Sequence, residues 1–381
     1  MFPETPFYYY DIQLLKSTLD TIAHEIAQYP DYHVHYAMKA NTNPCLLELI
    51  QQAGLGADCV SGGEVQRAID AGFSADKVVY AGVGKSDKEI LLALQHDIFC
   101  FNVESVPELH VINELAGTVG KVARVCLRIN PEVEAHTHTH IVTGMAENKF
   151  GIALSDMLQV VEQANKLENI SFLGLHFHIG SQITNMHDYV ALCQRINEIQ
   201  HLLNKQGIYP SVINVGGGLG IDYQEPDQNP IANFKAYFQV FTQHLHLRPQ
   251  QSLHFELGRS IVAQCGSLIT KVLYVKQATI KQFVIVDAGM TELIRPALYG
   301  AKHKIINLTS QETQMEIYDV VGPICESSDV FDKDLHLPTT QRGDLLAIRS
   351  AGAYGEVMAS TYNCRQLPLF YTSDELKIPL N

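Results

Sequence analysis

The sequence predicts an α/β protein in which a closed parallel barrel of eight strand–helix units, a (β/α)8 barrel, is followed by a second, β-rich domain. Short apolar runs alternate with longer amphipathic segments between residues 33 and 259. Eight such runs can be counted, and eight strand–helix units in about 250 residues are typical of this barrel. After about residue 264 the helical patterns become scarce, and strand-like runs separated by turn residues replace them.

The eight predicted strands are short and mostly apolar. They cover residues 33–40, 56–62, 77–82, 98–103, 122–130, 172–180, 211–218 and 252–259. Helical patterns fall between them, as in residues 43–54, 62–73 and 86–97, the last opening with Ser86 and acidic residues in its first turn. Because strands and helices alternate, the strands are expected to run parallel. An open doubly wound sheet is the alternative.

The domain boundary is predicted where the alternation of strand and helix patterns gives way to strand-like runs. Residues 14–264 are expected to form the barrel, and residues 265–381 a β-sandwich or β-barrel domain. The first segment, residues 1–13, contains PFYYYD, which reads as a strand that could pair into the second domain.

Composition argues against several classes of function. The chain has 381 residues with 41 acidic and 27 basic side chains, a net charge of -14 that opposes nucleic-acid binding. No apolar run approaches the ~20 residues that span a bilayer, and the N-terminus does not resemble a signal peptide. Eight scattered cysteines without a C-x-x-C pair indicate reduced thiols. We therefore expect a cytoplasmic protein with neither a membrane nor a nucleic-acid partner.

Polar residues gather where the predicted strands end. In barrels of this kind, catalytic residues lie at the C-terminal ends of the strands. In chain order the strand ends supply Lys39, Asp58, Ser61, Gly82, Asn102, Glu104, Arg128, Asn130, His178, Ser181, Gly216 to Gly218, Glu256 and Arg259. This set is too polar to be only the end of a core, so it predicts an active site.

A glycine-rich turn suggests a phosphate site. Gly216 to Gly218, in NVGGGLG, directly follow a predicted strand, and their backbone N–H groups can approach a phosphate closely. The same glycines could instead serve only a close approach of two chain segments. Arg259, in ELGR, suits a phosphate or an ion pair with Glu256. Neither segment matches a dinucleotide-binding fingerprint.

Lys39 stands at the end of an apolar predicted strand. Alone it could simply extend to water. Together with a phosphate-binding turn at the same barrel mouth, it suggests pyridoxal 5'-phosphate, which needs a covalently bound lysine, a phosphate cradle and a partner for its ring nitrogen. Lys39, the glycine turn with Arg259, and Glu256 could fill these roles. His178 could lie against the ring, or be an ordinary core histidine.

The segment EAHTHTH carries three alternating histidines, His136, His138 and His140, which would share one face of a strand. That spacing raises the possibility of a zinc site. The histidines fall in a long connection after the fifth predicted strand, and we interpret them as part of an active-site loop that could close over substrate. No metal is expected.

Nine short motifs extend the pattern from residue 36 to residue 363. They are YAMKAN, GADCVSGGE, NKFGI, HFHIGSQI, NVGGGLGIDY, ELGRSIVA, VDAGMTELIRPALYGA, VVGPICESSDVF and GAYGEVMASTYN. With these motifs the chain resembles the diaminopimelate branch of the fold-type III pyridoxal-phosphate decarboxylases. The segments RPALYGA and GPICESSD are the ones that resemble that branch specifically. The resemblance implies an alanine racemase-like barrel and pyridoxal phosphate. It also implies decarboxylation of meso-2,6-diaminopimelate at its D-centre to L-lysine and CO2, the last step of lysine biosynthesis.

The resemblance also implies roles for individual residues. Those that bind the cofactor would be Lys39, Asp58, His178, Ser181, Gly216, Gly217, Gly218, Glu256, Gly258, Arg259 and Tyr354. Those that bind substrate would be Arg259, Arg295, Tyr299, Cys325, Glu326 and Tyr354, and the catalytic ones Lys39, His178, Glu256 and Cys325. Cys325 and Glu326 resemble a pair that reaches the neighbouring subunit's site, so a homodimer with shared active sites is implied.

Three other functions stay open at this point. A decarboxylase of another basic amino acid or of carboxynorspermidine on the same fold is the nearest. An amino-acid racemase is a second, although Glu256 argues against it because the ring nitrogen there usually faces an arginine. A non-enzymatic cofactor carrier is a third, but it would lack the GPICESSD and RPALYGA segments.

Overall fold

The computed structural model of the chain describes residues 3–133 and 149–380. These residues form two compact units. Leu19–Gly220 and Asn233–Gly258 make up the barrel unit, and the described parts of Met1–Thr18, Ile221–Ala232 and Arg259–Asn381 make up the sheet unit. The domain limits that the sequence suggested, 14–264 against 1–13 plus 265–381, stay a prediction.

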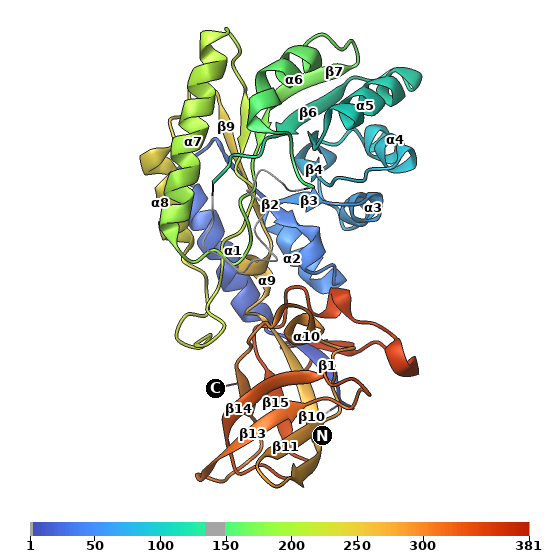
Figure 1. Cartoon of the computed structure of the whole chain (residues 1–381), viewed down its shortest axis with the longest axis vertical. Helices are drawn as coiled ribbons and strands as arrows, with labels where there is room; N and C mark the ends of the chain where they lie inside the picture. The colour runs from blue at the N-terminus through green and yellow to red at the C-terminus, as the bar shows by residue number, and fades with distance from the viewer. Residues whose placement is uncertain (1–2, 134–148, 381) are drawn as a thin grey trace. The chain divides into compact units, whose positions relative to one another are not determined.

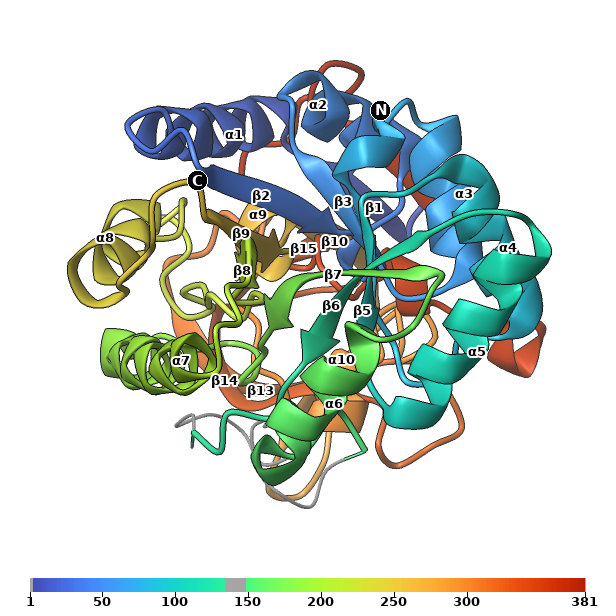
Figure 2. The ribbon, with the colours of Figure 1, turned by 90° about the horizontal axis from the view of Figure 1, so that it is seen from above.

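The barrel unit is built on eight parallel strands that close on themselves (Figure 2). The strands are β2 (Tyr32–Ala37), β3 (Gly56–Cys59), β4 (Val78–Tyr80), β5 (Cys100–Val103), β6 (Ala123–Arg128), β7 (Ile170–His176), β8 (Val212–Asn214) and β9 (Ser252–Leu257). Closure is visible at β2, where His35 is the ladder partner of Gly56 on β3 and of Glu256 on β9. The barrel prediction is therefore confirmed, and the open doubly wound sheet is wrong.

Helices form an outer ring around these strands (Figure 2). They are α1 (Ile12–Ile26), α2 (Pro44–Gln52), α3 (Gly62–Asp70), α4 (Asp87–His96), α5 (Val106–Thr118), α6 (Met157–Ala164), α7 (Met186–Lys205) and α8 (Phe234–His244). Single 3-10 turns occur at η2 (Ala75–Lys77) and η4 (Leu154–Asp156). Within the described ranges no helix combines the length and apolar character needed to cross a membrane.

The helix starts follow from capping residues placed just after the strands. Ser61 accepts a hydrogen bond from the backbone N–H of Glu64 at the start of α3, and Ser86 with Glu89 forms a capping box at the start of α4. Each cap satisfies N–H groups that the helix itself cannot pair, which is typically worth about 1 kcal/mol. At these two strand ends the chain enters the next helix within a few residues, whereas longer connections follow β6, β7 and β8.

An aromatic cluster packs α7 and α8 against β9. Phe255 on β9 meets Phe238 and Phe241 of α8 with ring centroids 5.0 and 5.2 Å apart, and Tyr237 lies 4.9 Å from Tyr189 of α7. All of these side chains are buried. Burial of each ring contributes about 1.5–3 kcal/mol, so this contact fixes the strand that carries Glu256.

Seven of the eight predicted barrel strands end earlier than the sequence indicated, and two of these ends concern candidate site residues. β2 ends at Ala37, because its ladder with β3 and β9 ends there, and Lys39 lies in the following 3-10 turn η1 (Met38–Ala40). Likewise β7 ends at His176, so His178 lies in the loop beyond it. Apolar patterning continued past both points, but only the paired neighbours determine where a strand stops.

The sheet unit contains eight strands (Figure 1). They are β1 (Phe7–Tyr10), β10 (Gly266–Gln277), β11 (Gln282–Val286), β12 (Ile305–Asn307), β13 (Met315–Val321), β14 (Val330–Pro338), β15 (Leu345–Ile348) and β16 (Leu369–Thr372). The main order is β12-β15-β10-β11-β13-β14, with β1 pairing both β10 and β16. The prediction that PFYYYD pairs into this unit is thus confirmed, since Phe7 pairs with Ile269 and with Leu369. Short helices α9 (Arg259–Val262) and α10 (Arg295–Tyr299) and the turns η5 (Glu356–Met358) and η6 (Tyr362–Cys364) complete the unit.

Candidate active site

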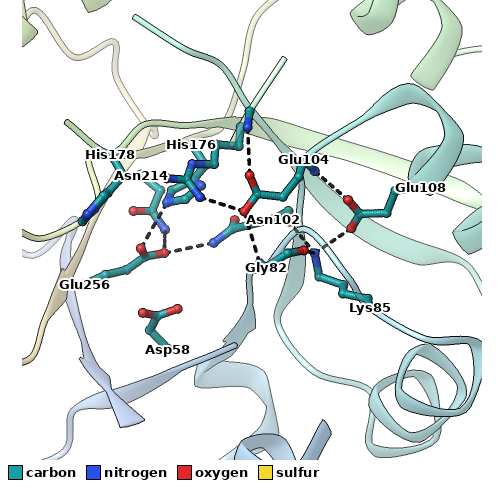
Figure 3. Close-up of polar contacts among 12 residues, drawn as sticks. Asp58, Gly82, Lys85, Asn102, Glu104, Glu108, His176, His178, Asn214 and Glu256 are labelled. Atoms are coloured by element: carbon teal, nitrogen blue, oxygen red, sulfur yellow. Dashed lines mark hydrogen bonds and ion pairs between the residues drawn. The ribbon is translucent and has the colours of Figure 1, made fainter. Parts of the chain in front are cut away.

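Glu256, the fifth residue of β9, is the centre of a hydrogen-bond network at the strand ends of the barrel (Figure 3). Its Oε1 accepts hydrogen bonds from Nδ2 of Asn102 at 2.9 Å and from Nδ2 of Asn214 at 2.7 Å. Its Oε2 lies 3.1 Å from Nε2 of His176. The four residues come from β9, β5, β8 and β7 and are all buried. The barrel therefore surrounds one carboxylate with three donors.

The charge state of Glu256 follows from these neighbours. Burial by itself raises the pKa of the carboxyl group, but the electrostatic interaction and hydrogen bond with His176, followed by the interactions with His178 and Lys39, outweigh burial and hold the pKa well below its ordinary value. Glu256 is therefore ionised across the physiological pH range. An ionised buried carboxylate is suited to pair with a cationic ring nitrogen.

Lys39 and Asp58 form the next contact at the barrel mouth. Nζ of Lys39 lies 3.9 Å from Oδ2 of Asp58, and the lysine side chain is 42% exposed whereas that of Asp58 is 2% exposed. Burial and the charge of Glu256 raise the pKa of Asp58, and Lys39 only partly opposes them. Its Oδ1 is buried without a hydrogen-bond partner. Asp58 thus offers an unsatisfied polar atom beside the amine of Lys39.

The glycine turn after β8 is shaped by close backbone approaches. A Cβ atom on Gly217 would lie 1.9 Å from the carbonyl oxygen of Glu256, and one on Gly218 would lie 2.5 Å from that of Gly180. Gly216 and Gly218 also have positive φ angles of 66° and 100°. The backbone N–H of Gly217 donates to Nδ1 of His178 at 3.3 Å. No other residue type fits here, and the turn presents backbone rather than side chains.

His178 and Gly258 lie beside these two features. Burial, Arg128 and Lys39 lower the pKa of His178 well below its ordinary value, so the ring is neutral. A Cβ atom on Gly258 would lie 3.0 Å from Cβ of Ala37 and 3.1 Å from that of Ala40. The absence of a side chain at Gly258 therefore allows the end of β9 to approach the turn that carries Lys39.

A second network joins the ends of β4, β5 and β6 (Figure 3). Oε1 of Glu104 accepts from Nη1 of Arg128 at 2.7 Å and from the backbone N–H of Gly82 at 3.2 Å, while Oε2 accepts from the N–H of Gly151 at 2.9 Å. Lys85 pairs with Glu108 at 2.6 Å with a lysine side chain only 1% exposed. The strand-end residues Gly82, Glu104 and Arg128 thus meet as the sequence order predicts.

The sheet unit carries a separate cluster of arginines. Nη1 of Arg259 donates to the hydroxyl oxygen of Tyr223 at 2.6 Å, and the guanidinium lies 5.0 Å from the ring centroid of Tyr354. Arg295 lies 5.0 Å from the ring centroid of Tyr223 and 2.9 Å from Nε2 of His303. Both arginines are buried among aromatic and neutral polar groups. Such guanidinium groups are suited to bind an anionic ligand.

The remaining predicted residues lie on loops of the two units. Ser181 lies in the loop after β7 of the barrel unit, and half-buried Tyr299 ends α10 of the sheet unit. Cys325 is exposed, and the adjacent Glu326 accepts a hydrogen bond from the hydroxyl of Tyr362 at 2.8 Å.

Some residues of this site were not found from the sequence. His176 was overlooked in favour of His178, although alternation along a strand places both on one face. Asn214 directly precedes Val215 and the glycine turn, and was read only as part of the strand. Nothing in the sequence pattern indicated that Tyr223 or His303 would contact arginines.

The histidines at 136, 138 and 140 lie outside the described residues, so the loop interpretation stays a prediction. In the described part of the chain, no group of three or more His, Cys, Asp or Glu residues is arranged to hold a metal ion.

Comparison with known proteins identifies the family. A family model described as pyridoxal-dependent decarboxylase, pyridoxal binding domain, matches residues 15–263, which is more than half of the chain. The chain belongs to the pyridoxal-dependent decarboxylases. It is 62% identical to a diaminopimelate decarboxylase of Bacteroides thetaiotaomicron over 98% of this chain and 96% of that one. It is 42% identical to a diaminopimelate decarboxylase of Aquifex aeolicus over 95% of this chain and 84% of that one.

Solved structures of the family agree with the fold. The crystal structure of diaminopimelate decarboxylase from Helicobacter pylori complexed with L-lysine superimposes with a TM-score of 0.92 and 41% identity, covering 99% of this chain and 93% of that one. The predicted combination of a (β/α)8 barrel with a β-rich second domain is therefore confirmed in full.

The strand-end residues fit pyridoxal phosphate, the cofactor of this decarboxylase family. At each of Gly216 to Gly218 a Cβ atom would clash with a backbone carbonyl oxygen, so only glycine permits this turn, a type of turn whose backbone can approach a phosphate. Asp58 has an unsatisfied buried oxygen next to the amine of Lys39, and Glu256 is ionised. A lysine, a phosphate turn and an acidic partner for the ring nitrogen are thus all present in the barrel unit.

Proposed function

We propose that the protein decarboxylates meso-2,6-diaminopimelate at its D-centre to yield L-lysine and CO2, the last step of lysine biosynthesis. The observation that carries this proposal is the 62% identity, over nearly both complete chains, to a protein named diaminopimelate decarboxylase. The lysine in the Helicobacter pylori relative is the expected product of such a reaction. The enzyme is a carboxy-lyase that depends on pyridoxal phosphate.

Most of the residues that would hold the cofactor belong to the barrel unit. Lys39 would supply the amine that binds it covalently, Glu256 would pair with its ring nitrogen, and neutral His178 would lie against the ring. The resemblance assigns the phosphate to Ser181, Gly216, Gly217, Gly218, Gly258, Arg259 and Tyr354, and gives Asp58 a further contact. When bound, pyridoxal phosphate supplies an electron sink for the electron pair left by the departing carboxylate.

The protein contributes charge placement and a proton. Glu256 stays ionised because His176 and two amides stabilise its negative charge. The ionised carboxylate would stabilise the transition state of decarboxylation, in which charge develops, more than the ground state. A proton must then replace the lost carboxylate at the same carbon. Cys325 and Lys39 are the two candidate donors, since both carry a transferable proton and either one suits general acid catalysis.

Residues of the sheet unit would distinguish diaminopimelate from other amino acids. Diaminopimelate carries a second amine and carboxylate at its far end. Arg295 and Arg259 are buried guanidinium groups whose Nη1 atoms contact His303 and the Tyr223 hydroxyl, and either group suits a carboxylate of the substrate. The resemblance adds Tyr299, Tyr354 and Glu326, whose carboxylate suits the ammonium group. A substrate without the far carboxylate would leave Arg295 unsatisfied.

We further propose that the protein forms a homodimer in which Cys325 and Glu326 of each subunit serve the neighbouring active site. The support is the resemblance of the GPICESSD segment together with the exposure of Cys325 on its loop. A cytoplasmic location is proposed as well, because eight scattered cysteines without a C-x-x-C pair suit a reducing compartment.

The second candidate function is decarboxylation of another basic amino acid or of carboxynorspermidine. Purified protein with pyridoxal phosphate should be offered meso-diaminopimelate, ornithine, arginine and carboxynorspermidine, with release of CO2 and amine product measured. Lysine formation from diaminopimelate at a kcat/KM at least about 100-fold above the others is expected. Preference for any other substrate would overturn the proposal.

The role of Lys39 is tested in parallel. Borohydride reduction of the holoenzyme should attach the cofactor to the peptide that contains Lys39. Buried Lys85 of the same barrel is the internal control, because its ion pair with Glu108 should leave it unlabelled. Label on Lys85 or any other lysine would contradict the assignment.

A further inference from the structure

The two amides that contact Glu256 are oriented by contacts of their own. Oδ1 of Asn214 accepts the backbone N–H of Gly216 at 2.9 Å, which turns its Nδ2 toward Glu256. Oδ1 of Asn102 lies 3.9 Å from Sγ of Cys100, a thiol whose single proton can point either to this oxygen or to Sγ of Cys126, also 3.9 Å away, while Nδ2 of Asn102 faces the same carboxylate. Neither amide can rotate without losing both of its contacts. The donors around Glu256 are therefore preset by the fold.

The carboxylate of Glu256 has more hydrogen-bond acceptor sites than its three donors occupy. A carboxylate has about four lone-pair sites, two on each oxygen. Both amides use Oε1, and His176 uses one site on Oε2. Among the residues that the structure describes, one acceptor site on Oε2 is therefore left.

The two donors to Oε1 of Glu256 are neutral amides. A carboxylate held by arginine would be neutralised, but an amide donates without carrying charge. Asn102 and Asn214 also do not titrate, so their support of the ionised form does not vary with pH. They stabilise the negative charge of Glu256 and leave it available to a cationic partner.

We propose that Asn102 and Asn214 are positioning residues of the decarboxylase. Their amides hold the carboxylate of Glu256 so that a single acceptor site on Oε2 receives the ring nitrogen of pyridoxal phosphate. This inference rests on the proposed function, because it takes Glu256 as the nitrogen partner. Asn214 has a second task, since its bond to Gly216 couples Glu256 to the phosphate turn and sets the spacing of these two anchors.

The test replaces each amide by an apolar side chain of similar size. In Asn102→Leu and Asn214→Leu, the ring nitrogen of 15N-labelled pyridoxal phosphate bound to the protein should shift toward its unprotonated value in NMR spectra, because the proton moves toward Glu256. The kcat should fall about 10- to 100-fold, the range for one lost hydrogen bond to a charged group, with KM changed by less than about 3-fold. Asn214→Asp should shift the nitrogen signal further, since two adjacent carboxyl groups must share a proton.

A matched control separates positioning from folding. The side chain of Asn197, in the same unit, bonds the main-chain carbonyl of His244 and the main-chain N–H of His246, and Asn197→Leu should keep the wild-type nitrogen signal. In a Glu256→Gln background, the leucine variants should add less than about a 2-fold change, because their effect passes through Glu256. If Asn214→Leu fails to fold, Asn102→Leu and Asn214→Ser carry the test.

The outcomes separate this inference from the proposed function. A wild-type nitrogen signal in folded Asn102 and Asn214 variants, or an undiminished effect in the Glu256→Gln background, would overturn the positioning role. Absence of lysine formation by the wild-type protein would overturn the proposed substrate instead. The nitrogen signal of bound cofactor would still decide the role of the amides in that case.

Discussion

Nη1 of Arg295 lies 2.9 Å from Nε2 of His303, and Nδ1 of the same imidazole lies 2.9 Å from the carbonyl oxygen of Arg349. A guanidinium group can only donate a hydrogen bond, so Nε2 of His303 is the acceptor. Nδ1 therefore carries the ring hydrogen and donates a hydrogen bond to the carbonyl oxygen. Burial and then Arg295 lower the pKa of His303 to about 3. A neutral imidazole therefore fixes Arg295 while leaving its positive charge uncompensated.

Replacing Arg295 should separate substrate binding from cofactor binding. In Arg295→Ala, kcat/KM for diaminopimelate should fall by about 100-fold or more, because the far carboxylate loses a charged partner. The absorption of bound pyridoxal phosphate should be retained. Arg342→Ala, an exposed arginine of the same unit, is the control and should behave as wild type. Near-normal turnover of Arg295→Ala would show that the assigned role is wrong.

Replacing His303 should affect binding more than turnover. In His303→Leu, Arg295 loses the acceptor that holds it, so KM for diaminopimelate should rise about 10-fold while kcat changes little. His303→Gln, which can both accept and donate, should recover part of the loss. Steady-state kinetics of lysine formation measures both. Equal KM values for the wild type and His303→Leu would argue against this arrangement.

The phosphate turn should not tolerate any side chain at Gly217. The Cβ of Gly217→Ala would lie 1.9 Å from the carbonyl oxygen of Glu256, so the backbone must move. We expect a loss of about 1–3 kcal/mol in unfolding free energy together with weaker cofactor binding, measured by urea unfolding and cofactor titration. Gly63→Ala is the control, because its nearest neighbour would be 3.7 Å away, and it should be tolerated. An unperturbed Gly217→Ala protein would contradict the cradle.

Histidines inside the barrel should make the protein sensitive to acid. His35 accepts at Nε2 from His254 at 2.8 Å and donates at Nδ1 to the carbonyl of Lys77 at 3.0 Å. Burial lowers the pKa of His35 to about 4 even though Glu256 and the Lys77 carbonyl oppose it. An unfolded histidine titrates near 6.5, so the unfolded chain binds more protons between pH 6.5 and 4.

The unfolding free energy should therefore be fully maintained above pH 6.5 and fall by up to about 3 kcal/mol as the pH drops to 4. Urea unfolding of the protein at several pH values measures this slope. His35→Gln should flatten it, whereas exposed His110→Gln should not. An unchanged slope in His35→Gln would show that other groups cause the acid sensitivity.

The shared-site dimer makes a prediction about mixtures. Cys325→Ala and Lys39→Ala proteins should each be nearly inactive, but a mixture that exchanges subunits should regain up to about a quarter of wild-type activity. That fraction follows because one site of each hybrid dimer would combine both intact residues. Subunit exchange is verified with differently tagged copies. No recovery after verified exchange would exclude sharing of the site through Cys325.

The amino-acid sequence by itself determined the barrel and the main residues of its mouth. Alternation of strand and helix patterns required parallel strands, and the carboxyl ends of parallel strands meet at one edge. The order of strand ends therefore predicts that Lys39, the turn at Gly216 and Glu256 lie at the same mouth of the barrel. The motif GPICESSD placed Cys325 and Glu326 only through resemblance, and their role stays a prediction.

The tertiary structure alone decided which side chains hold Glu256 and Arg295. Asn102, His176 and Asn214 lie 154, 80 and 42 residues from Glu256 along the chain, on three different strands. Periodicity reports which face a side chain occupies, but a hydrogen bond requires two atoms within about 3 Å. Only the register and closure of the eight strands set those distances.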